Sequence, residues 1–489
     1  MTYRQLLASN ADFRRLWLGQ VISEIGDWLN NIAVLALAIQ LAAGRSVGLA
    51  IAVYAVARHL PLFLFGPVAG VVVDRLDRRR VMIAADIVRA FLALGFLAAD
   101  RLASLPVIYA VGASLFSVSA FFNAAKRASI PNLVSGTEGL LSANSLSAST
   151  TAATIAVGSA LGGVVATALG RDTVFFLNAL TFLASAEMIR RIRKPVSRKQ
   201  KAVSSEQEAA SSERRTEGGG REISDLKSQV SNSESGIPTP ETSSSNLSAR
   251  DDSTAFNRLL AAFSLLPSIL RRAAWEFREG LRYVGRDALL RAVFVVAAGW
   301  GLGNGAARAL YSIFGARLGK DAVSGWGEGA RAFVERPTDF GISVLFVAMG
   351  VGGVLGAPLA RRFNRAGGAG LGARMGRSLV LDGCGLALFS LMPSLWVAAL
   401  VLVAREMNFA IWWTAQQTIM MKRTEDAFAG RVFATYETLT TLMMVASILV
   451  SGAAADRAGI RVVAAGGGSM VILSGLFWFL LRRRARAGD

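Results

Sequence analysis

Two long apolar segments are joined by the stretch Gly70-Val-Val-Val-Asp74-Arg75-Leu-Asp77-Arg78-Arg79-Arg80. It places a glycine, an acid and a cluster of arginines in one tight turn. A glycine lets two helices approach closely, arginines at such a turn can contact lipid headgroups, and Asp74 lies within reach of a helix end. The stretch therefore predicts a turn at a membrane surface. The alternative is a basic hairpin with no function of its own.

Apolar segments of this kind recur along almost the whole chain. Of its 489 residues, 53% are hydrophobic, and the mean hydropathy is +0.44. Runs of about 18 or more apolar residues are long enough to cross a bilayer as helices. The net charge of +19 does not favour nucleic acid as a partner, because most basic residues flank the apolar segments, where they set topology and contact anionic lipid. We therefore predict an all-α membrane protein embedded in the lipid bilayer.

The sequence predicts twelve transmembrane helices, six on each side of a long polar interruption. The connections on the side of the two termini carry more than twice as many Lys and Arg residues as those on the other side. By the positive-inside rule, both termini are expected to be cytoplasmic. The expected spans are roughly 16–41, 47–73, 81–99, 105–124, 141–168 and 173–190, then 289–314, 341–360, 375–392, 394–420, 432–453 and 462–481.

The interruption divides the chain into four predicted regions. Residues 1–194 form an N-terminal six-helix bundle, and residues 289–489 form a C-terminal one. Residues 195–255 are rich in Ser, Glu, Lys, Gly and Thr and cannot bury enough apolar surface to fold alone, so a disordered cytoplasmic linker is expected. Residues 256–288 are expected to hold an amphipathic helix that lies at the membrane interface. A long outer loop is expected at 315–340.

Several motifs resemble those of one transporter family. The opening stretch resembles the loop between helices 2 and 3 of major facilitator superfamily transporters, and the other motifs resemble the bacterial drug and siderophore exporter branch. The resemblance implies two pseudo-symmetric six-helix bundles around a central cavity, which opens alternately inward and outward. The motifs are Phe13-Arg-Arg-Leu-Trp17-Leu-Gly-Gln20, Ser23, Gly26-Asp27, Asp86-Ile-Val-Arg89, Ile130-Pro131-Asn-Leu-Val134, Ala143-Asn144 and Gly158-x-x-Leu-Gly162-Gly163.

The two halves of the chain also repeat each other. Phe121-Phe122 matches Trp412-Trp413, and Ala360 stands at the position that Asp74 occupies in the first half. Such internal repetition is typical of duplicated transporter folds.

Three positions depart from the family pattern. Asp77 stands where the family motif has glycine, and Ser159 follows Gly158 where a proline is frequent. Residues 105–124 carry no charge, whereas many drug–proton antiporters have an arginine in this span. These departures concern proton coupling and rocking geometry rather than the fold.

The first predicted span carries a polar stripe. Gln20, Glu24, Asp27 and Asn31 are spaced so that they share one face of a helix. Ionisable groups inside a bilayer are unfavourable and often mark functional sites. We expect the stripe to face the cavity, where Asp27, with Glu24 as second choice, binds the coupling proton or a cationic part of the substrate. A structural stripe bonded to neighbouring helices is the alternative.

Other charged residues are expected to complete the cavity. Arg58 is expected to pair with an acid of the stripe, and Arg405-Glu406 to line the second half. His59, the only histidine, is expected to be a packing residue rather than a proton relay.

Three further groups have expected structural roles. Asp86 and Arg89 are expected to form an ion pair, since they lie one helical turn apart. The glycines Gly158, Gly162 and Gly163 suit close helix packing. A conformational-switch motif is expected at the opening stretch, where Asp74 would meet the start of span 11 near Arg431 in the outward-open state. Its members are Gly70, Asp74, Arg75, Arg78 and Arg79.

The sequence predicts a transporter and no enzyme. It has no phosphate-binding loop of the G-x-x-x-x-G-K-[ST] type, and one Cys and one His do not favour a metal site, so no cofactor is expected. We expect a monomeric secondary active exporter of small amphiphilic or cationic molecules, coupled to protons, in a bacterial inner (plasma) membrane. The alternatives are a lysophospholipid or lipid flippase of the same fold and a non-transporting membrane sensor or assembly protein.

Overall fold

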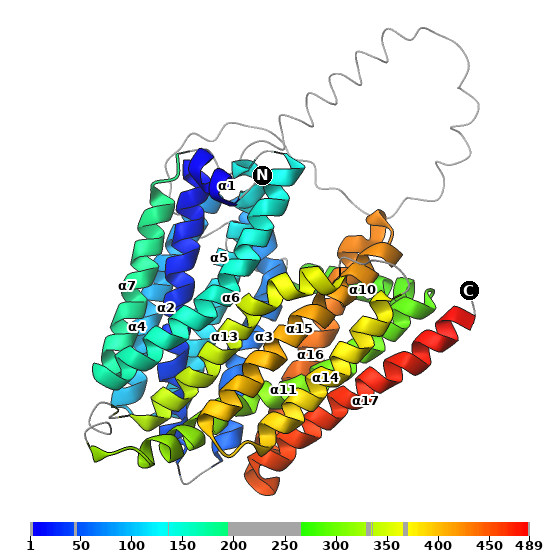
Figure 1. Cartoon of the computed structure of the whole chain (residues 1–489). Helices are drawn as coiled ribbons and strands as arrows, with labels where there is room; N and C mark the ends of the chain where they lie inside the picture. Colours follow the sequence, from blue (N-terminus) through cyan, green and yellow to red (C-terminus); the bar gives the residue numbers. More distant parts are fainter. Residues whose placement is uncertain are drawn as a thin grey trace, which may run out of the picture.

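The structure, a computed structural model, describes residues 3–43, 46–134, 136–193, 266–328, 334, 336–364 and 370–487. The regular secondary structure of these residues is α-helical, and Figure 1 shows the helices in two groups. The linker expected at 195–255 lies outside the described residues.

The helices form two bundles of six, which confirms the predicted fold class. The short helix α1 (Tyr3–Ser9) precedes the first bundle, and α10 (Leu266–Val284) precedes the second. The first bundle contains α2 (Ala11–Leu41), α3 (Val47–Arg75), α4 (Arg78–Arg101), α5 (Leu105–Leu133), α6 (Thr137–Ala168) and α7 (Arg171–Arg190). The second contains α11 (Ala288–Ser324), α13 (Pro337–Asn364), α14 (Leu371–Leu391), α15 (Leu395–Arg423), α16 (Asp426–Ala458) and α17 (Ile460–Ala487).

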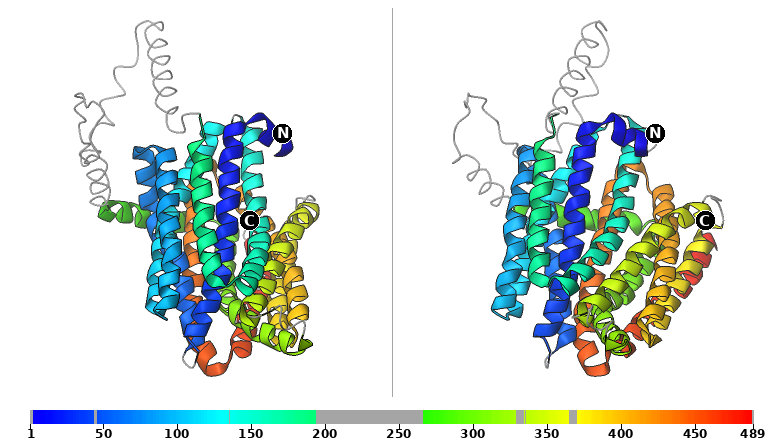
Figure 2. Two further views of the ribbon diagram at one scale, coloured as in Figure 1. Left: turned by 90° about the vertical axis from the view of Figure 1, so that its left-hand side faces the viewer. Right: turned by 60° about the vertical axis from the view of Figure 1, so that its left-hand side comes forward.

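The two bundles converge at one end of the molecule and diverge at the other (Figures 1 and 2). The diverging end holds both chain termini, and we call it the termini end. The opposite end is the far end. Two helix pairs make most of the contact between the bundles, α6 with α13 and α3 with α16.

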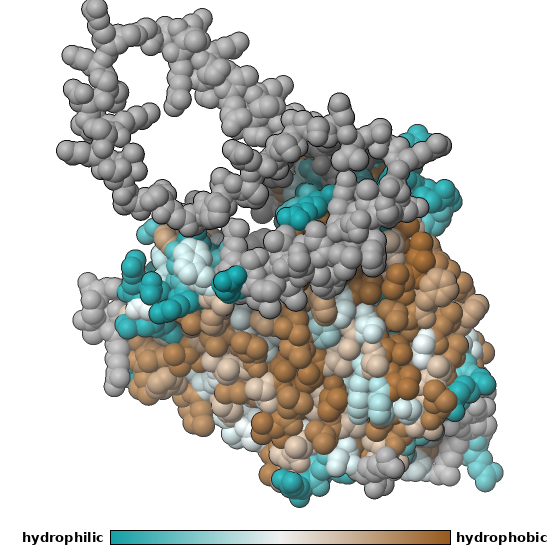
Figure 3. Space-filling model, turned by 180° about the vertical axis from the view of Figure 1, so that it is seen from behind, coloured by the Kyte–Doolittle hydropathy of each residue, from teal (hydrophilic) through white to brown (hydrophobic). Residues whose placement is uncertain are grey.

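The surface of the protein suits a lipid environment. Within the part of the chain that the structure describes, eleven helices are long and apolar enough to cross a membrane. Figure 3 shows a broad apolar band between hydrophilic ends, and side chains such as Phe91, Leu400 and Val450 are 71%, 69% and 70% exposed. The protein is therefore a multi-pass membrane protein.

The remaining long helix of the two bundles, α14, is less apolar. Arg374, Arg377 and Asp382 lie within its 21 residues. It packs between α15 and α17, just as α4 of the first bundle packs between α5 and α7. The two bundles therefore repeat the same arrangement of neighbours, and α14 completes the second bundle although its composition is more polar.

Glycines let α6 approach helices of both bundles. A Cβ added at Gly158 would lie 2.7 Å from the backbone oxygen of Ile25, and one added at Gly162 would lie 2.8 Å from that of Leu29. These two glycines therefore face α2. Gly163 faces Ser343 of α13 instead. Only a residue without a side chain fits at such distances, so α6 lies close to both neighbours.

Several helices extend further than the sequence suggested. α5 continues to Leu133, so Lys126 lies inside the helix and not in the turn expected after residue 124. α11 continues to Ser324 and α13 begins at Pro337, so much of the outer loop expected at 315–340 is helical.

Asp77, which departs from the family pattern, begins a helix. Its side chain accepts a hydrogen bond from the backbone N–H of Arg80 at 2.9 Å, which caps the N-terminus of α4. An N-cap of this kind stabilises a helix by about 1 kcal/mol. The acid thus ends the turn of the opening stretch by starting the next helix.

The orientation in the membrane remains a prediction, with the termini end in the cytoplasm. Ser9 at the end of α1 and Ser324 at the end of α11 are exposed and lie at opposite ends of the molecule. In a Cys384→Ala background, Ser324→Cys should react with an impermeant maleimide on intact cells. Ser9→Cys should react only after the membrane is opened. Labelling of Ser9→Cys on intact cells would reverse the orientation.

Candidate functional site

The polar stripe of α2 meets a lysine from α5. Lys126 Nζ lies 3.6 Å from Glu24 Oε1, and Gln20 Nε2 donates a hydrogen bond to the same oxygen at 2.8 Å. Thr154 of α6 donates to Glu24 Oε2 at 3.0 Å. Three helices therefore hold this carboxylate. The side chains of Glu24 and Lys126 stay 20% and 13% exposed.

One turn further along α2, Asp27 meets a second basic group. Arg89 Nη1 lies 4.0 Å from Asp27 Oδ2, and Arg89 also donates to Asp86 on its own helix. The guanidinium lies between the rings of Phe122 and Phe182, with Cζ 4.1 and 4.4 Å from the ring centroids. The structure thus brings Asp86 and Arg89 together in a buried position, and stacking on the rings further stabilises the charge.

Arg58 of α3 has a partner other than the expected acid. Its Nη1 donates to Oδ1 of Asn31, the last residue of the stripe, at 2.5 Å. Its guanidinium lies over the rings of Trp28 and Phe116, with Cζ 5.0 and 4.7 Å from the centroids. An amide oxygen and two aromatic faces therefore take the place of a carboxylate. The adjacent His59 contacts a backbone oxygen of its own helix, 2.8 Å from Nδ1.

The second bundle contains a buried network around Arg405 of α15. Its Nη1 donates to the hydroxyl of Tyr311 at 2.8 Å and to Glu406 Oε1 at 2.9 Å. Its Nη2 donates to Asn304 Oδ1 at 2.7 Å and to Asp382 Oδ2 at 3.1 Å. Only 2% of the Arg405 side chain is exposed. Two carboxylates and two neutral acceptors therefore surround a charge that would be very unfavourable alone.

The buried acids Asp86 and Asp382 occupy related places in the two bundles. In α4, the third residue after the acid is its partner, Arg89. In α14, the third residue after the acid is Gly385, and a Cβ added there would lie 3.3 Å from Cγ of Arg405. Arg405 of α15 thus fills the space that a side chain at Gly385 would need. Each bundle places an arginine beside this acid, but from a different helix.

The charged groups of α2 lie where the bundles begin to separate. Trp28 packs on Phe346 of α13, with ring centroids 6.0 Å apart, and this contact joins the two bundles. Gly350 approaches Ala156 of α6 closely near this level. Glu24 precedes Trp28 by one turn, about 6 Å, and therefore lies on the termini side of the contact.

A further arginine from the second bundle lies near these groups. Arg308 of α11 is exposed and close enough to interact electrostatically with His59 of the first bundle and with Glu406. Acidic and basic side chains of both bundles are therefore present near the junction, which suits a ligand that is itself charged.

Two carboxylates join the bundles at the far end. Asp339 of α13 accepts two hydrogen bonds from Arg171 of α7, at 3.1 and 2.8 Å, and both side chains are buried. Asp456 of α16 accepts from the backbone N–H groups of Gly48 and Leu49 at 2.8 and 3.1 Å. These N–H groups begin α3, so the carboxylate satisfies free donors and faces the positive end of a helix dipole. Together the contacts hold the far end closed.

The conformational-switch motif lies at the termini end. The Asp74 side chain is 75% exposed, and its partner within the described residues is Arg78, at 4.0 Å. Arg78 and Arg79 donate to backbone oxygens of α5 and α7 and so hold the turn against the first bundle. Arg75 is exposed, and no heavy atom lies within 4 Å of a Cβ added at Gly70. The motif has space around it in this state.

Sequence reasoning missed several members of these clusters. Lys126 was expected in a turn, and Asp382 had no assigned role. Asn304 and Tyr311 lie seven residues apart on α11, and this spacing places both on one face of a helix. That signal was available in the sequence, but nothing there indicated that Arg405 lies opposite them.

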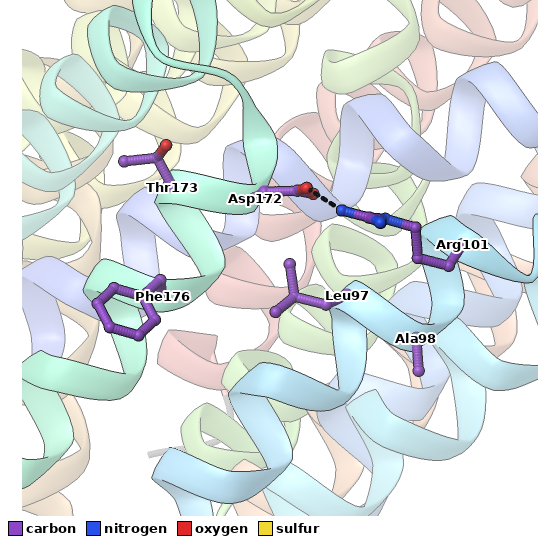
Figure 4. Close-up of a pocket in the computed structure, with 6 residues that line it drawn as sticks. All are labelled: Leu97, Ala98, Arg101, Asp172, Thr173 and Phe176. Carbon is purple, nitrogen blue, oxygen red and sulfur yellow. Dashed lines mark hydrogen bonds and ion pairs between the residues drawn. The ribbon is translucent and has the colours of Figure 1, made fainter.

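A surface pocket lies apart from all these groups. Figure 4 shows it between α4 and α7, where Arg101 and Asp172 form an ion pair at 2.8 Å. Both side chains of this pair are well exposed. No residue expected in the functional site lines the pocket, whose volume is about 520 Å³. The lining residues are Leu97, Ala98, Arg101, Asp172, Thr173 and Phe176.

The buried network and the exposed pair allow a matched test of stability. Arg405→Met leaves Asp382 buried without its counter-charge and should destabilise the purified protein by about 3–5 kcal/mol. The double variant with Asp382→Asn should recover part of this loss, because the unpaired charge is removed. Arg101→Gln breaks an exposed pair that solvent screens, so its effect on stability should be far smaller. Thermal unfolding in detergent, followed by tryptophan fluorescence, measures all three. Equal losses for Arg405→Met and Arg101→Gln would contradict the prediction.

Curated relatives match parts of the chain. An uncharacterized MFS-type transporter, YfiS of Bacillus subtilis (strain 168), is 29% identical over 186 residues, which are 38% of this chain and 43% of the relative. The putative bacilysin exporter BacE of the same organism is 34% identical over 139 residues, which are 28% of this chain and 34% of the relative. The matched segments thus span less than half the length of each of these relatives.

Solved transporter structures share the fold of nearly the whole chain. The nucleoside transporter NupG has a TM-score of 0.59 and 11% identity, with 96% of this chain and 99% of that chain covered. A bacterial homologue of the iron transporter ferroportin, in an inward-facing state, also has a TM-score of 0.59, with 13% identity and coverage of 96% and 98%.

The sequence profile of one family covers most of the chain. That profile, of the Major Facilitator Superfamily, matches residues 16–448, a range that includes helices of both bundles. The two-bundle architecture and the named relatives agree with it. The chain therefore belongs to the Major Facilitator Superfamily.

Proposed function

We propose that the protein is a proton-coupled exporter that moves small amphiphilic or cationic molecules by alternating access. The observation that carries the proposal is the pair of α2 carboxylates, Glu24 and Asp27. Each is held by one basic side chain, at 3.6 and 4.0 Å, beside the junction of the two bundles. A partly exposed carboxylate whose basic partner lies beyond hydrogen-bond distance can exchange that partner for a proton or a cationic ligand.

In this mechanism, substrate and protons compete for the same acids. A cationic group that enters from the termini end replaces Lys126 or Arg89 as the partner of a carboxylate. After the bundles reverse and the site opens at the far end, protons bind the carboxylates and remove their charge, which releases the cation. The protonated site then returns and loses its protons at the termini end. Each cycle exchanges protons for substrate.

Aromatic side chains beside the acids support an amphiphilic substrate. Trp28, Phe116 and Phe346 surround the junction and offer apolar surface together with ring faces that attract cations. Arg58 and Arg308 can also hold an anionic group, so a molecule with both charges fits. The similarity to BacE, a putative bacilysin exporter, supports export as the direction of transport.

The protein works as a monomer with both termini in the cytoplasm. With both termini in the cytoplasm of a bacterial cell, this structure is the inward-open state in the inner (plasma) membrane. Residues 1–194 and 289–489 then act as the two moving bodies. A single chain supplies both bundles and all the charged groups at their junction, which supports a monomer as the working unit.

The inward-open and outward-open states would each be stabilised by a carboxylate that binds a helix N-terminus, at opposite ends of the molecule. In this state, Asp456 near the C-terminal end of α16 binds the N-terminal end of α3. Asp74, near the C-terminal end of α3, is exposed here and would bind the N-terminal end of α16 in the outward-open state. The antiparallel helices α3 and α16 thus each carry, near the C-terminal end, an acid that can bind the N-terminal N–H groups of the other helix.

This reciprocity predicts opposite effects of two similar substitutions. Asp74→Ala should favour the inward-open state and Asp456→Ala the outward-open state, each by roughly 2- to 30-fold, because one capping contact contributes about 0.5–2 kcal/mol. In a Cys384→Ala background, spin labels at Gly70→Cys and Gly430→Cys, two positions with open space around them, report the width of the termini end. Distance changes of the same sign in both variants would refute the reciprocal arrangement.

The coupling role of Asp27 can be tested with a flat aromatic cation. Cells that express the protein should export ethidium, and a protonophore should stop this export. Asp27→Asn should lose gradient-driven export while the purified variant still binds ethidium through Glu24. Asp172→Asn, which changes an exposed acid outside the site, serves as the control. Full gradient-driven export by Asp27→Asn would exclude this acid and leave Glu24 as the next candidate. Movement of lysophospholipid without a proton gradient would instead favour the flippase alternative.

A further inference from the structure

Helix α10 has two chemically different faces. Its inner face packs on α16: Tyr283 stacks on Phe428 with ring centroids 4.6 Å apart, and Glu279 Oε1 lies 3.1 Å from Arg431 Nη1. A Cβ at Gly280 would collide with Thr435, so the helix lies directly against its neighbour. Helix α10 is therefore fixed in rotation about its own axis.

The outer face carries a row of four exposed arginines. Arg271, Arg278, Arg282 and Arg286 follow one another at intervals of seven, four and four residues, which keeps them on one side of the helix and its final turn. We call them the α10 arginine row. Within the described residues, none of the four forms an ion pair.

Apolar groups and an absence of exposed acid complete this face. Trp275 and Leu281 lie beside the row and are 57% and 40% exposed. The acids of this segment, Glu276, Glu279 and Asp287, are only partly exposed, and Glu279 turns toward Arg431. Arginines mixed with a tryptophan and a leucine are typical of helices at the interface between lipid headgroups and acyl chains.

The position of α10 favours lipid as the occupant of this face. Figure 2 shows α10 lying crosswise to the long helices, near the termini end of the second bundle. The bilayer surface runs past this end, because the apolar band of the protein stops there. Helix α10 contacts α16 of the second bundle and also α3 of the first. A ligand on its outer face is therefore placed to influence how these two helices sit.

We propose that the outer face of α10 binds the headgroups of anionic phospholipids, and that this binding favours the state in which the termini end is open. The second part rests on the proposed alternating access. Lipid on the arginine row holds α10, α10 holds Arg431 through Glu279, and Arg431 then stays away from Asp74. Anionic lipid thus opposes closure of the termini end.

Lipid binding is tested on the full chain in nanodiscs of phosphatidylcholine, or of phosphatidylcholine mixed equally with phosphatidylglycerol. Native mass spectrometry after mild delipidation counts the phosphatidylglycerol that stays bound. The triple variant Arg278→Gln, Arg282→Gln, Arg286→Gln should bind it more weakly by roughly 5-fold for each arginine, since each contributes about 1 kcal/mol near an anionic surface. Added salt should weaken binding to the parent.

The matched control also removes three positive charges at the termini end, but from helices other than α10. Arg80→Gln, Arg127→Gln and Arg362→Gln change three exposed arginines of α4, α5 and α13. This control should keep most of the bound phosphatidylglycerol. Equal loss in the two triple variants would overturn the binding site, because it would show that only net charge matters.

The conformational part has its own measurement. With spin labels at Gly70→Cys and Gly430→Cys, phosphatidylglycerol should widen the distance distribution of the parent toward the open state and leave that of the α10 triple variant unchanged. If lipid binds the row without any change in distance in the parent, the conformational role fails while the binding site stands. The Asp27→Asn transport test is independent of both results.

Discussion

A charged side chain at the depth of the bilayer must have a partner, and most of this structure follows from that requirement. Arg89 lies between two aromatic rings and beside two acids, whereas Arg405 binds two carboxylates, an amide and a hydroxyl. Helix α14 can cross the bundle with a buried aspartate because α15 supplies the matching arginine. Glu24 and Asp27 instead stay partly exposed, with their basic partners at 3.6 and 4.0 Å, and this contrast separates the candidate site from the charges that hold each bundle together.

The two bundles solve this pairing problem in different ways, although their helices have the same neighbours. In the first bundle, Asp86 and its arginine lie on one helix, and the rings of Phe122 in α5 and Phe182 in α7 flank the guanidinium. In the second, the pair joins α14 to α15 and also reaches α11 through Tyr311. The second bundle is thus tied together across three helices, whereas the first leaves the acids of α2 with separate partners on α4 and α5. This asymmetry is one reason to place proton and substrate exchange in the first bundle.

Much of the fold could be predicted from the sequence, because apolar runs of membrane length and a surface turn with clustered arginines are local signals. Contacts within one helix could be predicted for the same reason, as with Asp86 and Arg89. Partners across helices could not, since periodicity gives the face of a residue but not the neighbour of that face. Arg58 was therefore matched with an acid instead of Asn31, and Lys126 was missed because α5 continues past the point where its apolar run ends. The role of Asp77 as a helix cap could not be predicted either, because it depends on the residue at which α4 begins.

The glycines between the bundles have a mechanical consequence. Gly48 meets the backbone of Gly452, Gly163 meets the small side chain of Ser343, and Gly350 meets Ala156, so at these points the two bundles touch through backbone and small side chains. Large side chains at these points would interdigitate, and the helices would have to separate before they could slide past each other. Helix faces made of small residues do not interdigitate in this way. One helix can therefore rotate over the other while the number of close atomic contacts changes little. The small residues at the interface between the bundles therefore keep the barrier to their relative motion low.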